Sequence, residues 1–212
     1  MTMRRLCMAV LALVLAGCAT PSGEPAKGFA TPKIADAYIP LEGPVFLILK
    51  GDAAAVSLGN GIAVTDAHNA NLLDAKSMIG KSVNYDILFF HTEKATVELP
   101  TASPRVGERV IAYGQGGGGV RKAEGNVTRL DAPVEALCRK CEEQSAFTFE
   151  GNAGPGFSGG PVLDAADGKL LGIVFGYVDD PPGKRRIMYA YTMERVFAEL
   201  EEVARTLPVD RD

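Results

Sequence analysis

Short apolar or alternating runs recur along the chain from about residue 38 onward. Val, Ile, Leu, Phe and Tyr dominate these runs, and Gly, Pro, Asn or Asp bounds each of them, which is typical of β-strands joined by tight turns. The predicted strands are Pro44–Lys50, Gly61–Thr65, Ile87–His91, Arg109–Tyr113, Gly125–Leu130, Ala146–Glu150, Pro161–Leu163 and Leu170–Tyr177. The run of four glycines at residues 116–119 is expected to form a hairpin turn.

Helical spacing is confined to the end of the chain, apart from a short turn expected near residues 71–76. Thr192 can cap a helix over Met193–Leu207. The apolar residues on one face of this helix are Val196, Phe197, Leu200, Val203 and Leu207. A series of short strands closed by one terminal helix predicts an all-β domain of the double-barrel type.

Length and composition are consistent with one domain. The chain has 212 residues, of which 47% are hydrophobic, and this is enough to bury a core. Its 24 glycines and 13 prolines favour tight turns. The formal net charge of −4 offers no broad attraction to phosphate backbones, so no nucleic acid partner is expected, and the short basic run Lys184–Arg186 is interpreted as a solvated loop.

The first residues have the pattern of an export signal. Arg4 and Arg5 precede an apolar run, Leu6–Ala16, that is too short to span a bilayer. The run ends in Leu-Ala-Gly-Cys, which resembles the lipobox of bacterial lipoproteins and implies lipidation of Cys18. An ordinary cleaved signal peptide with a fortuitous cysteine is the alternative.

We therefore expect four regions along the chain. Residues 1–17 form a lipoprotein signal peptide, and residues 18–37 form a lipid anchor and flexible tether, because the segment is rich in Pro, Gly, Ser and Ala. Residues 38–207 form the folded domain, with a short tail at 208–212 and no room for a PDZ module. The alanine after Cys18 suggests, by the same resemblance, the outer membrane facing the periplasm.

The run Gly-Phe-Ser-Gly-Gly-Pro at residues 156–161 suits a nucleophilic serine. A serine attacks a carbonyl when a base takes its proton and backbone N–H groups face the oxygen that becomes negative. Gly156 can adopt backbone angles closed to other residues, so its N–H and that of Ser158 can form an oxyanion hole. Taken alone, the run could also be a turn before the proline.

The candidate base is His68, which follows an apolar strand and a Thr-Asp-Ala turn. His91, the other histidine, lies on a strand and lacks that turn. A carboxylate must fix the imidazole tautomer, and Asp86 opens an apolar strand of the kind that carries it. Asp66 and Asp74 lie nearer His68 in sequence, but neither opens such a strand.

The order His68, Asp86, Ser158 is the chymotrypsin order, and the three motifs together resemble the trypsin-like serine peptidases. Residues 106–114, 125–128, 172–176 and 189–196 are similar to strands of bacterial HtrA-type peptidases, the last including the entry into the terminal helix. The resemblance implies two six-stranded antiparallel β-barrels with a C-terminal α-helix. The 18 residues between His68 and Asp86 are fewer than usual, which implies a shortened first barrel.

The resemblance also assigns a substrate pocket, with Asn152 at its base and Phe175, Gly176 and Tyr177 along it. An uncharged base offers no counterion to a buried lysine or arginine, so small or medium apolar substrate side chains are expected. Phe157 stands where many digestive relatives carry an aspartate that pairs with a freed N-terminus. That activation switch is therefore expected to be missing.

Cys138 and Cys141 lie close together in a polar stretch of an exported chain. A local disulfide is the leading interpretation, and a zinc half-site or a redox pair has less support. We expect no metal and no cofactor.

Three functions remain open from sequence. The first is a serine endopeptidase that acts on peptides or proteins through an acyl-enzyme, bound to the membrane by a lipidated Cys18. The second is a catalytically silent scaffold lipoprotein with the same fold. The third is an esterase that uses the same triad.

Overall fold

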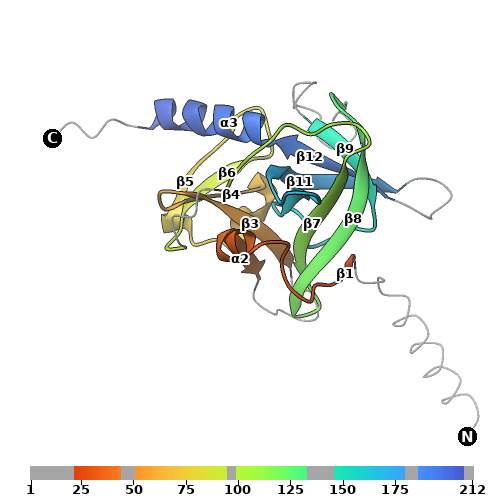
Figure 1. The fold of residues 1–212 in the computed structure, drawn as a ribbon. Helices are drawn as coiled ribbons and strands as arrows, with labels where there is room; N and C mark the ends of the chain where they lie inside the picture. The colour runs from red at the N-terminus through yellow and green to blue at the C-terminus, as the bar shows by residue number, and fades with distance from the viewer. Residues whose placement is uncertain (1–21, 44–50, 95–98, 133–145, 180–185, 208–212) are drawn as a thin grey trace, which may run out of the picture.

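The computed structural model describes residues 22–43, 51–94, 99–132, 146–179 and 186–207. They form two antiparallel sheets and a C-terminal helix (Figure 1). The expected signal peptide, Cys18, the predicted strand Pro44–Lys50, the cysteine pair Cys138 and Cys141 and the C-terminal tail lie outside the described residues. Within these residues, no helix is long and apolar enough to cross a membrane.

The first sheet has five strands in the order β2-β3-β4-β6-β5. They are β2 (Tyr38–Glu42), β3 (Asp52–Gly59), β4 (Ile62–Thr65), β5 (Met78–Lys81) and β6 (Leu88–His91). The alternation along β3 places Ala54 and Val56 in the core between the sheets, while Ala53 and Ala55 face a smaller cluster on the other side. Because both faces of β3 are covered, its small side chains fit where larger ones would not.

The second sheet closes on itself. Its strands are β7 (Arg109–Gly116), β8 (Gly119–Arg129), β9 (Ala146–Gly151), β10 (Pro161–Asp164), β11 (Leu170–Asp179) and β12 (Arg186–Thr192). The order β8-β7-β10-β11-β12-β9 is closed by pairing of β8 with β9, and a short strand β1 (Glu24–Pro25) adds to β8. Phe147, Phe149 and Val162 fill the barrel interior.

The predicted all-β architecture is confirmed, with two differences in detail. The second sheet is a closed six-stranded barrel, whereas the described part of the first sheet has five strands where six were expected. Strands β1, β2, β3 and β5 were not predicted. Alanine-rich β3 has weak strand propensity, and β5 is only four residues long and contains a glycine.

Helix α3 (Met193–Thr206) begins where the sequence predicts, with the Thr192 hydroxyl accepting a hydrogen bond from the Arg195 N–H at 3.2 Å. Met193, Val196 and Val203 face the core, and the helix packs on β5, β11 and β12. Two residues predicted on the buried face are instead 40% exposed, Phe197 and Leu207. Buried Glu199 lies on the inner face because it accepts hydrogen bonds from Ser82 and Arg195.

The fold begins earlier than the expected boundary at residue 38. Thr31 caps a short helix α2 (Pro32–Ala37) in which Ile34 and Ala37 are fully buried. Phe29 packs between Tyr38 and Tyr113, with ring centroids 5.1 and 4.9 Å away. Residues 22–37, expected to be a tether, are therefore part of the domain. We call residues 22–42 the N-terminal strap.

Hydrogen bonds hold the N-terminal end of the strap against the second sheet. The Arg121 guanidinium donates to the carbonyl oxygens of Ser22, at 2.9 Å, and Gly23, at 2.6 Å. The Gly23 N–H in turn donates to the Asn152 carbonyl at 2.8 Å. The strap thus supports the loop that leads from β9 to Ser158.

Replacement of Arg121 by alanine is expected to lower the free energy of unfolding by about 1–3 kcal/mol, because two charge-assisted hydrogen bonds to the strap are lost. Urea denaturation at neutral pH measures this. Arg129, an exposed arginine on the same strand, is the matched control, and Arg129→Ala should change stability by no more than about 0.5 kcal/mol. Equal effects of both substitutions would show that the strap is not held in this way.

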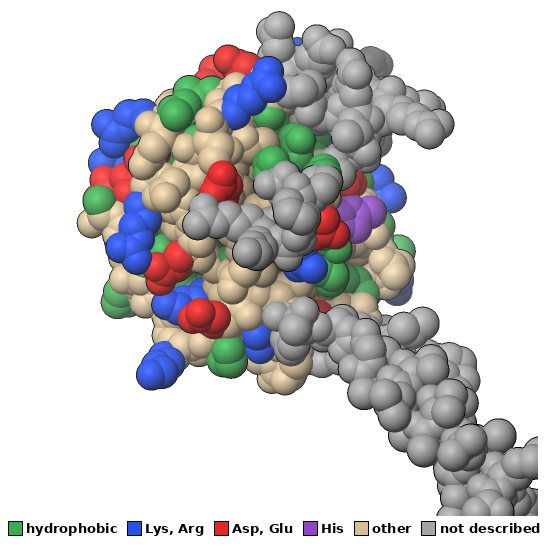
Figure 2. Space-filling view, turned by 90° about the vertical axis from the view of Figure 1, so that its right-hand side faces the viewer, with side chains coloured by type: hydrophobic (Ala, Val, Ile, Leu, Met, Phe, Trp, Pro, Cys, Tyr) green, Lys and Arg blue, Asp and Glu red, His purple; other side chains and the backbone are tan. Residues whose placement is uncertain are grey.

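Surface charge is mixed. On the face shown in Figure 2, acidic and basic side chains are interspersed. Exposed ion pairs such as Lys169 with Asp167, 2.7 Å apart, contribute little to stability individually.

Candidate active site

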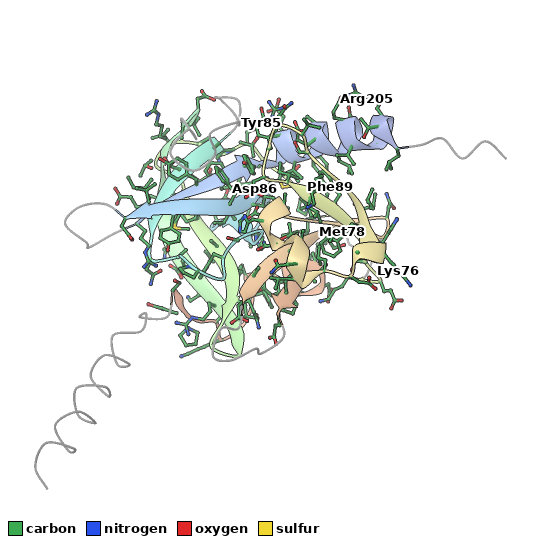
Figure 3. The ribbon with its side chains drawn as sticks, turned by 180° about the vertical axis from the view of Figure 1, so that it is seen from behind. Lys76, Met78, Tyr85, Asp86, Phe89 and Arg205 are labelled. Atoms are coloured by element: carbon green, nitrogen blue, oxygen red, sulfur yellow. The ribbon has the colours of Figure 1, made fainter. Side chains whose placement is uncertain are left out.

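Two hydrogen bonds join His68 to Asp86. His68 lies in the 3-10 turn η1 (Ala67–Leu72) directly after β4, and Asp86 lies just before β6, which pairs with β4. The His68 backbone N–H donates to Asp86 Oδ1 at 2.9 Å, and His68 Nδ1 lies 2.6 Å from Asp86 Oδ2. Figure 3 shows Asp86 beside this turn. A proton on Nδ1 is thereby favoured, which leaves Nε2 free to act as a base.

Asp86 is positioned from the second sheet as well. Its backbone N–H donates to the Tyr191 hydroxyl at 3.2 Å. The Tyr191 ring stacks on Phe175 with centroids 4.0 Å apart, and burial raises the pKa of Tyr191, so its hydroxyl stays neutral. Phe175, expected along the substrate pocket, is 5% exposed and committed to this stack.

Ser158 lies in the loop between β9 and β10, and the first sheet holds its backbone. Its carbonyl oxygen accepts hydrogen bonds from the Ala54 N–H at 2.9 Å and from Asn69 Nδ2 at 3.3 Å. Asn69 is next to His68 in sequence, so one turn carries the imidazole and supports the serine. In the described part of the chain, no hydrogen bond joins Ser158 Oγ to His68 Nε2.

The two expected oxyanion donors are available. Gly156 has φ of +91°, and its carbonyl oxygen accepts from the Gln115 N–H at 2.8 Å. Within the described ranges, neither the Gly156 N–H nor the Ser158 N–H donates to a protein acceptor. Both can therefore serve an oxygen of a bound ligand.

Phe157 is fully buried in the core of the second barrel. Its ring lies next to Gly23 of the N-terminal strap and to Gly114 of β7. The residue before Ser158 is thus anchored by apolar packing, and the strap covers it.

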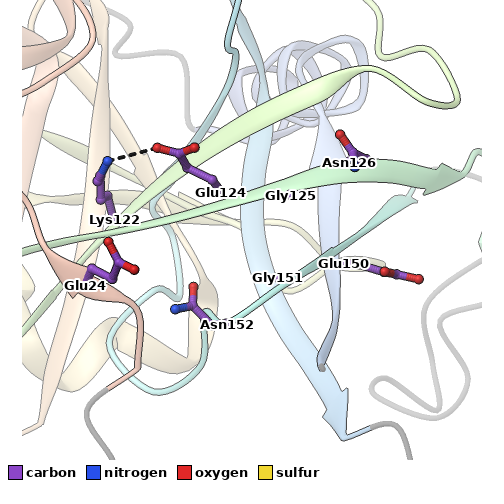
Figure 4. Close-up of a pocket in the computed structure, with 8 residues that line it drawn as sticks. All are labelled: Glu24, Lys122, Glu124, Gly125, Asn126, Glu150, Gly151 and Asn152. Carbon is purple, nitrogen blue, oxygen red and sulfur yellow. Dashed lines mark hydrogen bonds and ion pairs between the residues drawn. The ribbon is translucent and has the colours of Figure 1, made fainter. Parts of the chain in front are cut away.

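Asn152 directly follows β9. It is exposed, and it lines a recess with Glu24, Lys122, Glu124, Gly125, Asn126, Glu150 and Gly151 (Figure 4). Lys122 and Glu124 form an ion pair of 2.9 Å within this recess. The recess does not include Ser158, His68 or Tyr177, so Asn152 does not share it with them.

Gly176 and Tyr177 are half-buried on β11, and an arginine lies over the tyrosine. The Arg186 guanidinium is 4.8 Å from the Tyr177 ring centroid, and it also bonds the Ala153 carbonyl oxygen at 3.1 Å and Ser22 Oγ at 3.2 Å. The interpretation of Arg186 as part of a solvated loop is therefore wrong, because this residue opens β12. Nothing in its local sequence distinguishes it from Lys184.

Asp66 is a further acidic group in the site. It is fully buried, and neither carboxyl oxygen has a hydrogen-bond partner. Oδ2 lies 4.0 Å from His68 Nε2. Burial, together with the charge of Asp86, raises the pKa of Asp66 well above its ordinary range, and the Gly159 N–H lowers it only in part.

One group of described residues could in principle hold a metal ion. Its possible ligand atoms lie within 4.8 Å of one another and belong to Asp66, His68 and Asp86. However, both Asp86 oxygens already accept bonds from His68. The three side chains therefore do not present three free ligands, and we assign them no metal.

Comparison with known proteins identifies the family. Residues 57–173, more than half of the chain, match the trypsin-like peptidase domain family. No curated protein matches the chain significantly.

Solved structures share the fold. The Rv3671c protease of Mycobacterium tuberculosis, in its active form, is 17% identical with a TM-score of 0.65, covering 88% of this chain and 91% of that one. An inactive serine-to-alanine mutant of Rv3671c from strain H37Rv is 19% identical with a TM-score of 0.61, covering 90% and 100%.

The HtrA-type protease AlgW with a tripeptide is 18% identical with a TM-score of 0.66 over 82% of this chain, which spans 62% of the AlgW chain. His68, Asp86 and Ser158 all fall within the segment that matches the family. The chain belongs to the trypsin-like peptidase domain family and has the fold of a serine protease.

Proposed function

We propose that this protein is a serine endopeptidase in which His68 is the general base, Asp86 orients it and Ser158 is the nucleophile. The observation that carries the proposal is the double hydrogen bond between His68 and Asp86, formed in a turn that also holds the Ser158 backbone. The nearby N–H groups of Gly156 and Ser158 supply the oxyanion donors.

The chemistry follows from these positions. His68 Nε2 takes the Ser158 hydroxyl proton as Oγ attacks the peptide carbonyl carbon, and Asp86 stabilises the imidazolium that forms. The carbonyl oxygen becomes negative and accepts hydrogen bonds from the two backbone N–H groups. The imidazolium then protonates the leaving amine, and water hydrolyses the acyl-enzyme by the same steps.

Peptides are the proposed substrate class. AlgW has been solved with a tripeptide and a decapeptide, and it shares this fold at 18% and 16% identity. The proposed location is the bacterial envelope, with lipidated Cys18 holding the domain at the outer membrane. The esterase alternative would use the same three residues, and the scaffold alternative would keep the fold without turnover, so both are tested below.

Labelling with a fluorophosphonate probe tests the nucleophile. The full-length chain should be labelled at neutral to mildly alkaline pH, and Ser158→Ala should abolish labelling because the attacking oxygen is gone. Ser77→Ala, which removes a hydroxyl from the turn η2 (Ala75–Ser77), is a matched control that should leave labelling unchanged. Loss of labelling in His68→Ala would support the same site.

An unlabelled wild type would favour the scaffold alternative. Labelling that survives Ser158→Ala would mean that another residue is the nucleophile. If the labelled enzyme cleaves ester substrates but no member of a peptide library, the esterase alternative is correct.

A further inference from the structure

Residues 154–157, which we call the oxyanion turn, carry the Gly156 N–H that the proposed mechanism requires. The Phe157 N–H donates to the Gly154 carbonyl oxygen at 3.1 Å, which closes the turn. Pro155 is its second residue, and Gly156, with φ of +91°, is its third. This arrangement fits a type II turn, whereas a type I turn has its central peptide group turned over, so that the same N–H points elsewhere. The form of this turn therefore decides whether the oxyanion donor is available.

The Arg186 side chain contacts the segment that leads into the oxyanion turn. Its Nη1 donates to the carbonyl oxygen of Ala153, at 3.1 Å, and to Ser22 Oγ of the N-terminal strap, at 3.2 Å. Its Nε donates to Asp179 Oδ1 at 2.9 Å, and the guanidinium lies over the Tyr177 ring. A planar guanidinium that is bonded through two of its nitrogens and stacked on one face is held in one orientation. Arg186 thus joins the loop before Ser158 to the strap and to β11.

The strap reaches both ends of the oxyanion turn. At the first residue, a Cβ on Gly154 would overlap Arg186 Nη1 and Ser22 Oγ. At the last residue, the Phe157 ring lies so close to the strap that a Cβ on Gly23 would overlap it. Both ends are therefore in tight contact with the strap or with the arginine that binds it, and the turn has little room to change its form while the strap is in place.

We propose that Arg186 is a positioning residue that, together with Ser22 and Gly23 of the strap, holds the oxyanion turn in its type II form. It acts through the Gly156 N–H and does not touch the reacting atoms. Its effect on rate rests on the proposed peptidase function, but the contacts that fix the turn do not. Release of residues 22–23 would remove an oxyanion donor and leave the base bonded to its aspartate, because those two residues lie beside β4 and β6.

Fluorophosphonate labelling of the full-length chain at several probe concentrations tests this role. Arg186→Met keeps the length of the side chain and removes all of its donors. The limiting rate constant at saturating probe should fall by at least about 10-fold, because an oxyanion donor acts in the transition state. The probe concentration that gives half of this rate should stay within about twofold of the parent value, since binding of the probe is not affected. A substitution that only loosened the fold would not produce this split in a folded sample.

Arg205→Met is the matched control. Arg205 is an exposed arginine of α3 that pairs with Glu202 at 2.9 Å, and its substitution should change neither parameter. A parental limiting rate in Arg186→Met would overturn the proposal, and so would an equal loss in Arg205→Met. An increase only in the half-maximal probe concentration would also overturn it, because Arg186 would then bind the substrate and not position the turn.

Gly23→Ala tests the same turn from the side of the strap. The added Cβ would overlap the Phe157 ring, so this variant should lower the limiting rate constant by at least about 10-fold as well. Gly28→Ala lies in the same strap, has nothing within 4 Å of its Cβ and should be labelled at the parental rate. Parental labelling of Gly23→Ala would show that the strap does not hold the turn, which would overturn the proposal.

The backbone amide resonance of Gly156 reports on the turn whether or not the chain is an enzyme. In nuclear magnetic resonance spectra of the full-length chain, Arg186→Met should shift or split this resonance, and Arg205→Met should leave it in place. A resonance that Arg186→Met does not move would overturn the proposal. A resonance that does move, in a chain whose parent form is never labelled, would support the role of Arg186 in the turn and reject the peptidase function.

Discussion

Replacement of Asp86 by asparagine is expected to slow serine acylation by about 10⁴-fold while leaving the fold intact. Asp86 Oδ2 accepts the Nδ1 proton of His68, whereas an amide at this position can donate its own N–H to Nδ1. The imidazole proton would then sit on Nε2, the atom that must accept the Ser158 proton. The backbone bond from the His68 N–H to Oδ1 can persist, so the change is mainly one of tautomer.

The rate constant of fluorophosphonate labelling measures this effect without a known substrate. Asp74→Asn is the matched control, because Asp74 is another aspartate close to His68 in sequence and its side chain caps η2 by accepting from the Lys76 N–H at 3.0 Å. That substitution should keep the parent rate. A parental rate in Asp86→Asn would mean that Asp86 does not orient the base.

Gly156→Ala is expected to lower the same rate constant by at least about 10²-fold. The φ of Gly156 is +91°, and a Cβ there would overlap the carbonyl oxygen of Gln115. The loop must move to relieve this overlap, which takes the Gly156 and Ser158 N–H groups away from the developing oxyanion. A loss of stability on the order of 1–3 kcal/mol should accompany the change, since the backbone angle itself is strained for alanine.

Gly107→Ala separates backbone strain from steric overlap. Gly107 has a similar φ of +84°, but nothing lies within 4 Å of a Cβ at that position. The substitution should lower the thermal midpoint slightly and leave labelling unchanged. If both alanine variants label at the parental rate, the Gly156 N–H is not part of an oxyanion hole.

Much of the fold could be read from the sequence because local patterns carry it. Runs such as Arg109–Tyr113 and Leu170–Tyr177 are short and mainly apolar, and Thr192 marks the start of α3. The alanine-rich β3 was missed because its burial on both faces depends on how the two sheets pack. The folded strap was also missed, since the few apolar residues among its polar ones are buried only by distant partners such as Tyr113.

Part of the candidate site could also be predicted from the sequence, and part could not. His68 and Asp86 were found from motifs on neighbouring strands, and the structure brings them together. The proximity of Asp66 to Nε2 could not be inferred from a position two residues before His68. The prediction that Asn152 and Phe175 line one pocket relied on resemblance alone. In the structure, Asn152 lines a recess with Glu24 of β1, and Phe175 stacks on Tyr191. No local sequence motif specifies either contact.

The N-terminal strap also affects how the protein unfolds. Its β1 pairs with β8 of the second sheet, its β2 pairs with β3 of the first, and Gln115 of β7 bonds both Tyr38 and Glu42. A continuous piece of backbone thus belongs to both sheets, so melting either sheet removes partners from the other. A half-unfolded species that keeps His68 in place but releases Ser158 is disfavoured, and the two halves of the active site should be gained and lost cooperatively.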